Sequence, residues 1–409
     1  MLVLAWRNIW RHQSRSIGAA FAIGFTVWMG LSYFGLVNAY RDGLYVNLTD
    51  SVGHVQIHVR DYRDIRDFRE AVITDASAMR GRIESALPGV IIAAALEVPA
   101  LLSGEDRARG VLLGGLAQPP ALRDRFVAKY VRDGRLPSAE DLEGIAIGGA
   151  LARTLKVKLG DTVYAYAPGT DGTGASAYVV VGILHFPDPS QDARGALLSL
   201  PAAQELAAPR AVSRFELHFP QFRHTTDDAA LVPLRGRLQD ALGGDVVVES
   251  WRETYPSLSS LERMLRPLVV FFVGLFFVLA GLLVVNTIYL SVVERTRELG
   301  VVIALGARRG RVMRMVLAES LLLCVTGAAV GLALGLVTVG RLAQGFAYPG
   351  EWGDITEAYG LPRVMYASAG VVDVVIIVTF VIGIGVVAAL WPARVAGRLA
   401  PVEAMRFVA

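Results

Sequence analysis

The sequence predicts a membrane α-helical protein with four transmembrane helices and a large α+β extracytoplasmic domain. The chain has 409 residues, of which 54% are hydrophobic and 19% charged. This balance is too apolar for a soluble protein and too charged for one embedded wholly in lipid. Four long uncharged stretches are the candidate membrane helices, and a charged block separates the first from the second.

The longest uncharged stretch, Pro267–Val293, is followed directly by an arginine-rich segment. At about 1.5 Å per residue this stretch reaches roughly 40 Å as a helix, more than the roughly 30 Å of a hydrocarbon core. We therefore expect the helix to tilt or to project beyond the membrane. Residues 294–314 contain six arginines, which indicates the cytoplasmic side of the membrane.

The other boundaries follow from charge. Three Lys or Arg residues lie in residues 1–15, six in 294–314 and three in 394–409, against two in 341–363. This asymmetry predicts four crossings with both ends in the cytoplasm. In order, the predicted segments are an amphipathic N-terminus (1–15), a first membrane helix (16–40), a periplasmic domain (41–266), a second helix (267–293), a cytoplasmic segment (294–314), a third helix (315–340), a short periplasmic loop (341–363), a fourth helix (364–393) and a cytoplasmic tail (394–409).

Two strand–helix–strand patterns flank the middle of the periplasmic block. The first has alternating strand residues at 53–60, a helix capped by Thr74 and ended by Pro88, and a strand at 90–96. The second has strands at 215–219 and 246–249 around a helix that begins near Pro233. We predict a porter-like subdomain from residues 41–100 and 211–266.

The intervening residues 101–210 are predicted to form an inserted β-rich subdomain. Its clearest element is a hairpin, with strands Thr162–Ala167 and Ala177–Leu184 joined by the glycine-rich turn Pro168–Gly174.

Several classes of chemistry find no support in the sequence. The single cysteine, Cys324, excludes disulfides within the chain and CxxC sites. No GxxxxGK[ST] phosphate loop occurs, so any ATP must be bound by another chain. No basic stripe with interleaved aromatic residues suggests nucleic acid. We therefore expect no catalytic, metal or cofactor-binding residues.

Two small groups of polar residues have alternative interpretations. His54 and His58 lie on one face of the predicted strand and could form a metal pair, but no third ligand is evident; exposed positions of an alternating strand explain them more simply. Glu319 and Asp373 stand at the edges of the third and fourth membrane helices. A position at the membrane interface, with Asp373 near a helix N-terminus, is the favoured interpretation.

Two sets of apolar positions can pack or bind within the membrane. Gly327, Gly331 and Gly335 form a double GxxxG pattern, which predicts close helix packing, either within one protomer or between protomers. Phe272, Phe276 and Leu279 give the second membrane helix an apolar face. This face could meet a lipid-like cargo, and ordinary helix packing would explain it equally well.

Residues 294–314 combine charges with an apolar run and predict helix, glycine stop and helix on the cytoplasmic face. Orientation by positive charge accounts for the arginines. It accounts neither for Glu294 and Glu298 nor for the apolar run Val301–Leu305. An apolar ridge rimmed by charge predicts a surface for a cytoplasmic partner.

Three motifs in the chain resemble one family. ERTRELGVVIALGARRGRVMRMVLAESLLL (from Glu294), WPARVAGRLAPVEAMR (Trp391–Arg406) and LAWRNIWRHQSRS near the start resemble the MacB/FtsX-like permeases, the membrane subunits of type VII ABC transporters. The resemblance implies a separate ATPase subunit that binds ATP and Mg²⁺ and contacts the segment after the second helix. The implied contact residues are Glu294, Arg295, Arg297, Glu298, Gly300, Val302, Leu305, Gly306 and Ala307.

Within that family, GHVQIHVRDYRD at residues 53–64 is most similar to the lipoprotein-releasing LolC/LolE type. The resemblance implies an inner-membrane permease, paired with a second copy or a paralogue, that moves lipoprotein or other lipid-like cargo by mechanotransmission. The hairpin at residues 168–174 is shorter than the carrier-binding hairpin of that type, so docking of a periplasmic carrier stays open. The alternative is an FtsX-like regulator that activates a periplasmic cell-wall hydrolase.

Overall fold

The computed structural model describes residues 13–62, 65, 67–170, 172–186, 188–222, 228–294, 296–305, 307–358 and 361–398. The chain divides into two compact units. The membrane unit comprises residues 1–41, 261–346 and 364–409, and the outer unit comprises residues 42–260 and 347–363. Most of the predicted cytoplasmic N-terminus and tail, residues 1–12 and 399–409, lies outside the described residues.

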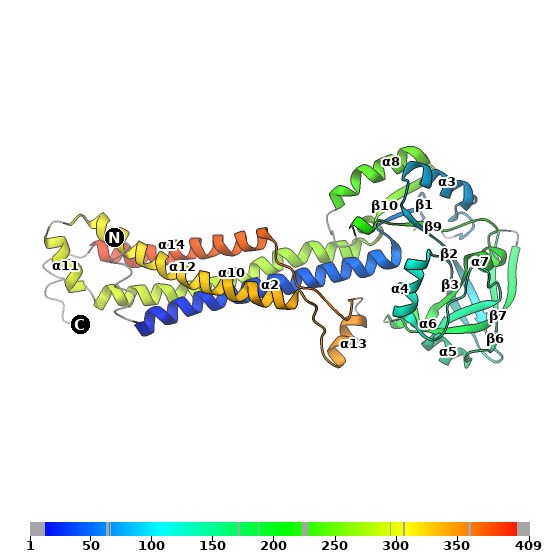
Figure 1. Ribbon diagram of the computed structural model, residues 1–409, viewed down its shortest axis with the longest axis horizontal. Helices are drawn as coiled ribbons and strands as arrows, with labels where there is room; N and C mark the ends of the chain where they lie inside the picture. The colour runs from blue at the N-terminus through cyan, green and yellow to red at the C-terminus, as the bar shows by residue number, and fades with distance from the viewer. Residues whose placement is uncertain are drawn as a thin grey trace. The chain divides into compact units, whose positions relative to one another are not determined.

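The membrane unit contains long apolar helices that run side by side (Figure 1). Among the described residues, four helices are long and apolar enough to cross a membrane. They are α2 (Gln13–Val52), α10 (Pro256–Glu294), α12 (Arg309–Leu342) and α14 (Val371–Arg398). The four membrane helices expected from the uncharged stretches are thus confirmed as helices.

Each of these helices is longer than its uncharged stretch. Helix α10 begins at Pro256, well before the predicted start at residue 267, and continues through Pro267. Proline suits the first turn of a helix, where its missing N–H costs nothing. Inside the helix Pro267 removes one backbone hydrogen bond, which a long helix held by tertiary packing tolerates. The lack of charge therefore marks the apolar span of a helix rather than its ends.

The interior of the bundle is packed by aliphatic and aromatic side chains. Val27 and Leu31 of α2 are fully buried. The rings of Phe277 on α10 and Phe380 on α14 stack with 5.6 Å between their centroids. The hydroxyl of Ser320 on α12 donates to the Gly385 carbonyl of α14 at 3.2 Å. These contacts tie the helices together within one chain.

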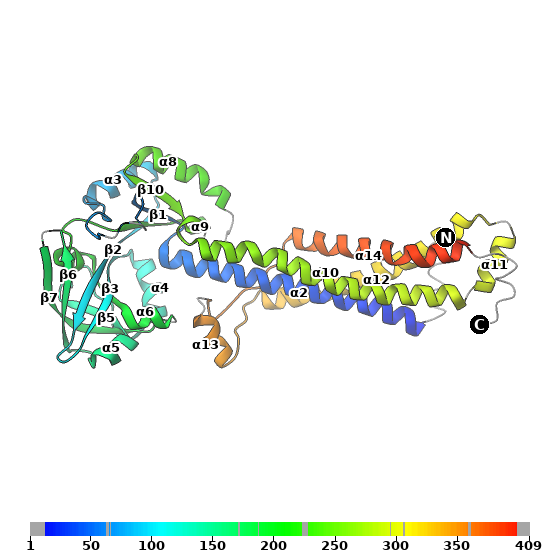
Figure 2. The ribbon, with the colours of Figure 1, turned by 180° about the vertical axis from the view of Figure 1, so that it is seen from behind.

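A closed ring of strands forms one part of the outer unit (Figure 2). Pairing runs in the order β2–β3–β8–β5–β7–β6 and returns to β2, with β3–β8 and β5–β7 parallel and the other pairs antiparallel. The strands are β2 (Ile91–Ser103), β3 (Ala108–Ala117), β5 (Gly144–Gly148), β6 (Thr162–Gly169), β7 (Gly172–Leu184) and β8 (Gly195–Ser199). A further strand of four residues, β4 (Val131–Gly134), pairs with β7 outside the ring.

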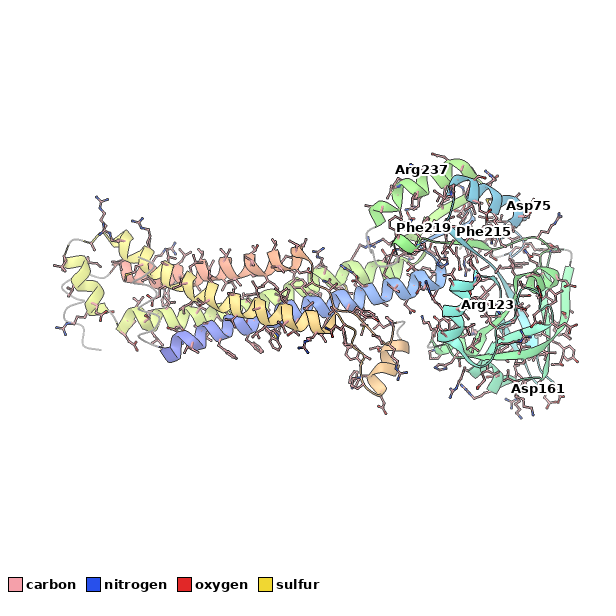
Figure 3. The ribbon with its side chains drawn as sticks, viewed as in Figure 1. Asp75, Arg123, Asp161, Phe215, Phe219 and Arg237 are labelled. Atoms are coloured by element: carbon pink, nitrogen blue, oxygen red, sulfur yellow. The ribbon has the colours of Figure 1, made fainter. Side chains whose placement is uncertain are left out.

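An open sheet forms the other part of the outer unit, in the order β10–β1–β9–β2. Its strands besides β2 are β1 (Val55–Val59), β9 (Arg214–His218) and β10 (Val246–Ser250), all antiparallel to their neighbours. Helices α3 (Ala76–Ala86) and α8 (Val232–Leu242) pack against each other beside it. Phe215 of β9, labelled in Figure 3, is fully buried in the shared core.

Strand β2 belongs to both the ring and the open sheet. Its first half, from Ile91 to Ala95, pairs with β9, and Leu101–Ser103 pair with β6. The predicted boundary at residue 100 therefore falls inside a continuous strand. The α+β character of the block is confirmed, but a split into two separate subdomains is not.

The remaining elements are short helices of both units; α11 belongs to the membrane unit and the others to the outer unit. They are α4 (Pro120–Tyr130), α5 (Gly149–Leu155), α6 (Pro189–Arg194), α7 (Leu200–Leu206), η2 (Pro220–Phe222), η3 (Asp228–Ala230), α9 (Trp251–Thr254), α11 (Thr296–Ala304) and α13 (Glu351–Ala358).

Two local expectations for the outer unit were wrong. The N-cap of α3 is Asp75, whose carboxylate accepts from the Ala78 N–H at 3.0 Å, and not Thr74. The hairpin turn is also tighter than the stretch Pro168–Gly174, because the strands extend until Gly169 pairs with Gly172. The glycines at 169, 172 and 174 are therefore part of the strands.

Candidate functional site

The predicted partner-binding segment lies between two membrane helices. Helix α10 ends at Glu294, α11 occupies Thr296–Ala304, and α12 begins at Arg309. This is the order helix, interruption, helix that the sequence indicates. Arg295 and Gly306, two of the predicted contact residues, lie outside the described residues.

Charged and apolar side chains of this segment are exposed together. Glu294, Arg297 and Glu298 are exposed, and Ala307 is half-buried. Leu305 is 84% exposed and Val301 is 42% exposed. The remaining predicted contact residues, Gly300 and Val302, lie within α11.

Leu305 and Val301 lie on one side of this segment. The Leu305 N–H donates to the Val301 carbonyl at 2.9 Å, which closes a helical turn beyond the end of α11. Residues four apart on a helical turn are neighbours on its surface. An exposed leucine and valine beside Arg297 and Glu298 give the apolar centre and charged rim that characterise protein interfaces.

The three glycines of the GxxxG pattern lie against α2 of the same chain. A Cβ atom on Gly327 would stand 2.5 Å from the Ala20 carbonyl oxygen, and one on Gly331 would stand 2.3 Å from that of Gly24. On Gly335 it would meet the Leu31 side chain at 2.8 Å. Glycine therefore allows the α2 and α12 backbones to touch, and the structure uses the pattern within one protomer.

The apolar face of α10 is open in this single chain. Phe272 and Phe276 are each 40% exposed, and Leu279 is 55% exposed. These three side chains are free of covering residues from the described part of the chain over much of their surface.

Both acidic residues are buried, and Glu319 lies well inside α12 rather than at its edge. Glu319 on α12 is 7% exposed and Asp373 in the first turn of α14 is 6% exposed. The Asp373 carboxylate accepts hydrogen bonds from the Gly370 N–H and from the side-chain amide of Asn38, each at 2.9 Å. The position of Asp373 at a helix N-terminus agrees with the sequence interpretation, because the helix dipole favours a negative charge there.

His58 on β1 and His54, the residue before this strand, are both buried, so their interpretation as exposed positions was wrong. Strand β1 lies between β10 and β9, and His54 and His58 are 3% and 4% exposed. His54 Nδ1 accepts from the Phe219 N–H at 3.2 Å. Among the residues that the structure describes, no group of three or more His, Cys, Asp or Glu side chains could hold a metal ion.

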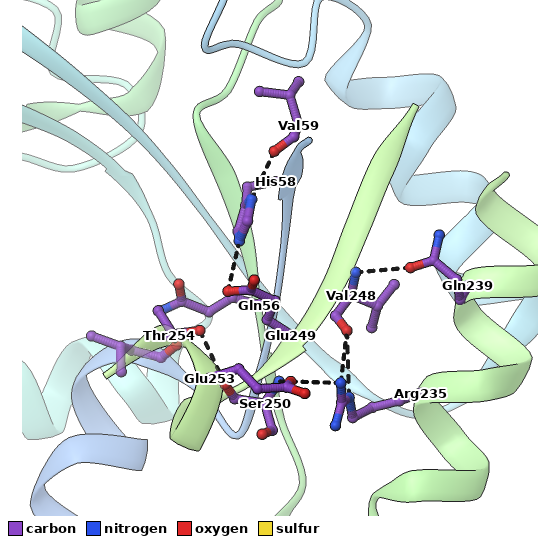
Figure 4. A network of polar contacts seen from close by, with 11 residues as sticks. Gln56, His58, Val59, Arg235, Gln239, Val248, Glu249, Ser250, Glu253 and Thr254 are labelled. Atoms are coloured by element: carbon purple, nitrogen blue, oxygen red, sulfur yellow. Dashed lines mark hydrogen bonds and ion pairs between the residues drawn. The ribbon is translucent and has the colours of Figure 1, made fainter. Parts of the chain in front are cut away.

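His58 belongs to a polar network on β10 and its neighbours that sequence reasoning missed (Figure 4). Its Nε2 lies 3.3 Å from a Glu249 carboxylate oxygen. At the end of β10, Ser250 and Glu253 form a capping box that begins α9. Arg235 of α8 pairs with Glu253 at 2.5 Å and donates to the Val248 carbonyl. The S-x-x-E spacing at Ser250–Glu253 is the one signal that could have indicated this network.

A second buried polar group fixes β9 beside β2. Arg214 pairs with Glu97 at 2.7 Å and with Glu216 at 2.9 Å. Burial opposes the charge of Arg214, yet the two carboxylates raise its pKa above the ordinary value. Burial also raises the pKa of the Tyr62 hydroxyl, with the Glu97 carboxylate adding to the effect. A paired and hydrogen-bonded cluster of this kind specifies strand register rather than chemistry.

Part of the chain matches a known family model. Residues 270–401 match the model of the FtsX-like permease C-terminal domain. This range contains most of α10, all of α11 and α12, and α14. The chain thus carries an FtsX-like permease domain.

Curated relatives support the wider superfamily. The chain is 34% identical over 137 residues to the macrolide export ATP-binding/permease protein MacB of Rhodopirellula baltica, which is 33% of this chain and 17% of that protein. It is 32% identical over 180 residues to the pyoverdine export ATP-binding/permease protein PvdT of Pseudomonas putida, which is 44% of this chain and 21% of that protein. The chain therefore spans about a fifth of these relatives. The resemblance to the MacB/FtsX-like permease superfamily is confirmed.

Two solved structures are similar to part of the chain. The periplasmic region of MacB from Actinobacillus actinomycetemcomitans matches 52% of this chain and 95% of its own, with a TM-score of 0.33 and 12% identity. The extracellular domain of the noncanonic ABC-type transporter YknZ from Gram-positive bacteria matches 48% of this chain and 99% of its own, with a TM-score of 0.31 and 15% identity. The finer likeness to the lipoprotein-releasing type stays a prediction.

Proposed function

We propose that this chain is the membrane subunit of an ABC-type transporter and that a separate ATPase subunit binds the α11 segment. One observation carries the proposal. An exposed apolar pair, Val301 and Leu305, lies beside exposed Arg297 and Glu298 between two membrane helices of an FtsX-like permease domain. The ATPase would supply the ATP and Mg²⁺ sites, because this chain has no phosphate-binding loop.

Helix α10, which precedes α11, suggests how ATP hydrolysis would be coupled to movement of the permease. Helix α10 is one helix of 39 residues, or about 58 Å at 1.5 Å per residue. Its residues 256–260 belong to the outer unit, and the rest belongs to the membrane unit. Movement of α11 by the ATPase would shift a stiff rod that is shared by both units. Mechanotransmission of this kind needs no water-filled pore.

The cargo and its direction of movement are the finer part of the proposal. The relatives are named for export of macrolides and pyoverdine, so their names give no support to lipoprotein cargo. We infer that the cargo is an amphiphilic compound that leaves the inner membrane on the outer side. The exposed face of Phe272, Phe276 and Leu279 suits contact with such a compound or with a second permease chain.

The direct test reverses the charge at Glu298. Glu298→Lys puts a like charge against a basic groove of the ATPase, and a desolvated like-charge contact costs several kcal/mol. We expect at least a tenfold loss of co-purified ATPase or of its stimulated hydrolysis in reconstituted membranes. A second variant, Leu305→Glu, tests the apolar part of the same surface.

The matched control is Glu140→Lys, an exposed glutamate of the outer unit, which should leave the ATPase bound and active. If Glu298→Lys and Leu305→Glu both behave like Glu140→Lys, the α11 segment does not hold the ATPase. If the parent chain couples ATP hydrolysis to activation of a cell-wall hydrolase and exports nothing, the regulator hypothesis replaces transport.

A further inference from the structure

The outer unit contains a surface pocket whose rim is cationic. The pocket has a volume of about 700 Å³ and lies between α5, the turn that follows it, and the ends of β4 and β7. Ionisable side chains from these elements line it. They are Arg132, Asp133, Arg153, Lys156, Lys158 and His185.

The charges of this rim are not balanced by its own residues. Among the residues that line the pocket, four Lys and Arg side chains outnumber one carboxylate. The carboxylates of Asp161 and Asp192 lie behind the rim, where backbone N–H groups donate to them. Within the described part of the chain, none of the four cations forms an ion pair, although Arg125, Arg135, Arg214 and Arg235 of the same unit do. Cations gathered around a concavity concentrate the positive potential there.

The floor of the pocket is apolar. Ala152 and Leu184 are buried beneath it, and Val157 and Ile183 are half-buried at its sides. Leu159 is 41% exposed at the edge. A volume of several hundred Å³, an apolar floor and a few convergent polar groups are the usual features of a small-molecule site.

Backbone hydrogen bonds hold the rim in place. Lys156 ends α5 in the left-handed conformation, with φ of 59°, and its N–H donates to the Ala152 carbonyl. Two residues on, the Lys158 N–H donates to the Asp161 carboxylate at 2.9 Å; Asp161 is labelled in Figure 3. Across the pocket, the His185 N–H donates to the Tyr130 carbonyl at 2.7 Å. The cations therefore project from a frame that is already formed.

The buried Asp192 fixes the other side of this frame. Its carboxylate accepts from the N–H groups of Gly149, Ala150 and Phe186 at 3.2, 2.7 and 3.0 Å. Asp192 is 6% exposed, and these three backbone N–H groups satisfy its carboxylate oxygens. It anchors the start of α5 and leaves the Arg153 guanidinium, which extends over Gly149, available to a ligand.

We propose that this pocket binds an amphiphilic anion that carries a phosphate group. The phosphate is held by Arg132, Arg153 and Lys158, and the apolar part of the ligand covers the floor at Leu159 and Ile183. A phosphate monoester matches several converging cations better than a carboxylate does, because it presents about two charges and three acceptor oxygens. The proposal concerns the outer unit alone and does not depend on α11 or on an ATPase.

Binding of hexyl phosphate to the full chain in phosphatidylcholine nanodiscs tests this proposal. Calorimetric titration should show saturable binding that weakens with added salt, since salt screens exposed charges. Hexanol and hexanoate should bind at least about tenfold more weakly. The variant Arg153→Gln with Lys158→Gln should weaken hexyl phosphate by at least about tenfold, because it removes two charge-assisted contacts.

The matched control removes two exposed arginines elsewhere in the unit, Arg109→Gln with Arg237→Gln, and should bind hexyl phosphate like the parent. Equal binding by the pocket variant and the control, or equal binding of hexanol, would overturn the proposal. If the double variant has a lower melting temperature than the parent, the single variant Arg132→Gln on β4 replaces it and should also weaken hexyl phosphate binding.

A further arm of the experiment identifies the source of the ligand. Nanodiscs with phosphatidylglycerol will compete with hexyl phosphate if the pocket takes a headgroup of the surrounding membrane. If they do not compete, the phosphate belongs to a soluble ligand, and both results agree with the proposed chemistry.

Discussion

The side-chain amide of Asn38 on α2 donates a hydrogen bond of 2.9 Å to the carboxylate of Asp373 on α14. The same amide donates to the Ser368 carbonyl at 2.9 Å, and the carboxylate also accepts from the Gly370 N–H. Residues 335 positions apart in the sequence are thus joined at the start of α14. The buried carboxylate of Asp373 thus has two donors, one from α2 and one from the residues just before its own helix.

Removing this carboxylate should loosen the start of α14. Asp373→Ala leaves the Gly370 N–H and one bond of Asn38 unsatisfied, and a buried polar group without a partner costs about 1–3 kcal/mol. We expect a lower melting temperature in detergent, with Asp373→Asn intermediate because it keeps an acceptor oxygen. Thr379→Ala on the exposed side of α14 is the control. An unchanged melting temperature for Asp373→Ala would show that water replaces these bonds.

The contact between α2 and α12 should be intolerant of a single methyl group. Gly331→Ala would place a Cβ 2.3 Å from the backbone oxygen of Gly24, which requires the two helices to separate. Overpacking of this kind costs about 1–3 kcal/mol. Gly340→Ala on the same helix meets nothing within 4 Å and should be neutral or slightly stabilising. The prediction fails if both variants have the same melting temperature.

The predicted topology can be read from two single cysteines in a Cys324→Ala background. Gly236 on α8 and Gly310 on α12 both have open space where a Cβ would stand. Gly236→Cys should react with an impermeant thiol reagent on intact spheroplasts, and Gly310→Cys should react only after the membrane is opened. The reverse pattern would place the outer unit in the cytoplasm and refute the arginine argument.

The outer unit should lose stability in mild acid because of His218. Burial is the main cause that lowers the pKa of His218 from 6.5 to about 4, and the electrostatic effect of His54 is the next; Asp50 and Arg125 are the charged neighbours. The folded state therefore binds a proton less readily than the unfolded state. Stability from this group is complete above pH 6.5 and is lost as the pH falls toward 4, by up to about 3 kcal/mol.

The measurement is the unfolding midpoint of the outer unit, followed by circular dichroism at about pH 7.5 and about pH 5. His218→Gln should reduce the difference between the two midpoints. If the His218→Gln protein keeps the full difference between the two midpoints, another group causes the pH dependence.

Local signals in the sequence predicted much of this fold, because each rests on neighbouring residues. Charge-free stretches located all four membrane helices. Alternation located β1, and the strand–helix–strand pattern located β9 and β10. The glycines at 327, 331 and 335 predicted close packing, although the sequence could not say that α2 of the same chain is their partner. Helix ends were harder to predict from the sequence: α10 begins before its predicted start and continues through Pro267.

Features that depend on distant residues were not predictable. His54 and His58 alternate like exposed residues, yet both are buried, His58 on β1 between β10 and β9 and His54 just before that strand. The cationic pocket gathers β4, α5 and β7, which are separated by other elements in the chain. The α11 segment is the exception, because its glutamates, apolar run and arginines are adjacent in sequence, and the residues alone indicated a docking surface.

The closed ring of strands also decides where another chain could add a strand. A ring has no unpaired edge, so extended peptides and partly unfolded neighbours find no template along it. Within the described sheet, the free edges are β4, which has four residues and carries Arg132 and Asp133, and β10. A short charged edge resists pairing, so β10, with its run Val246–Val248, is where the outer unit is most exposed to aggregation when α8 moves aside.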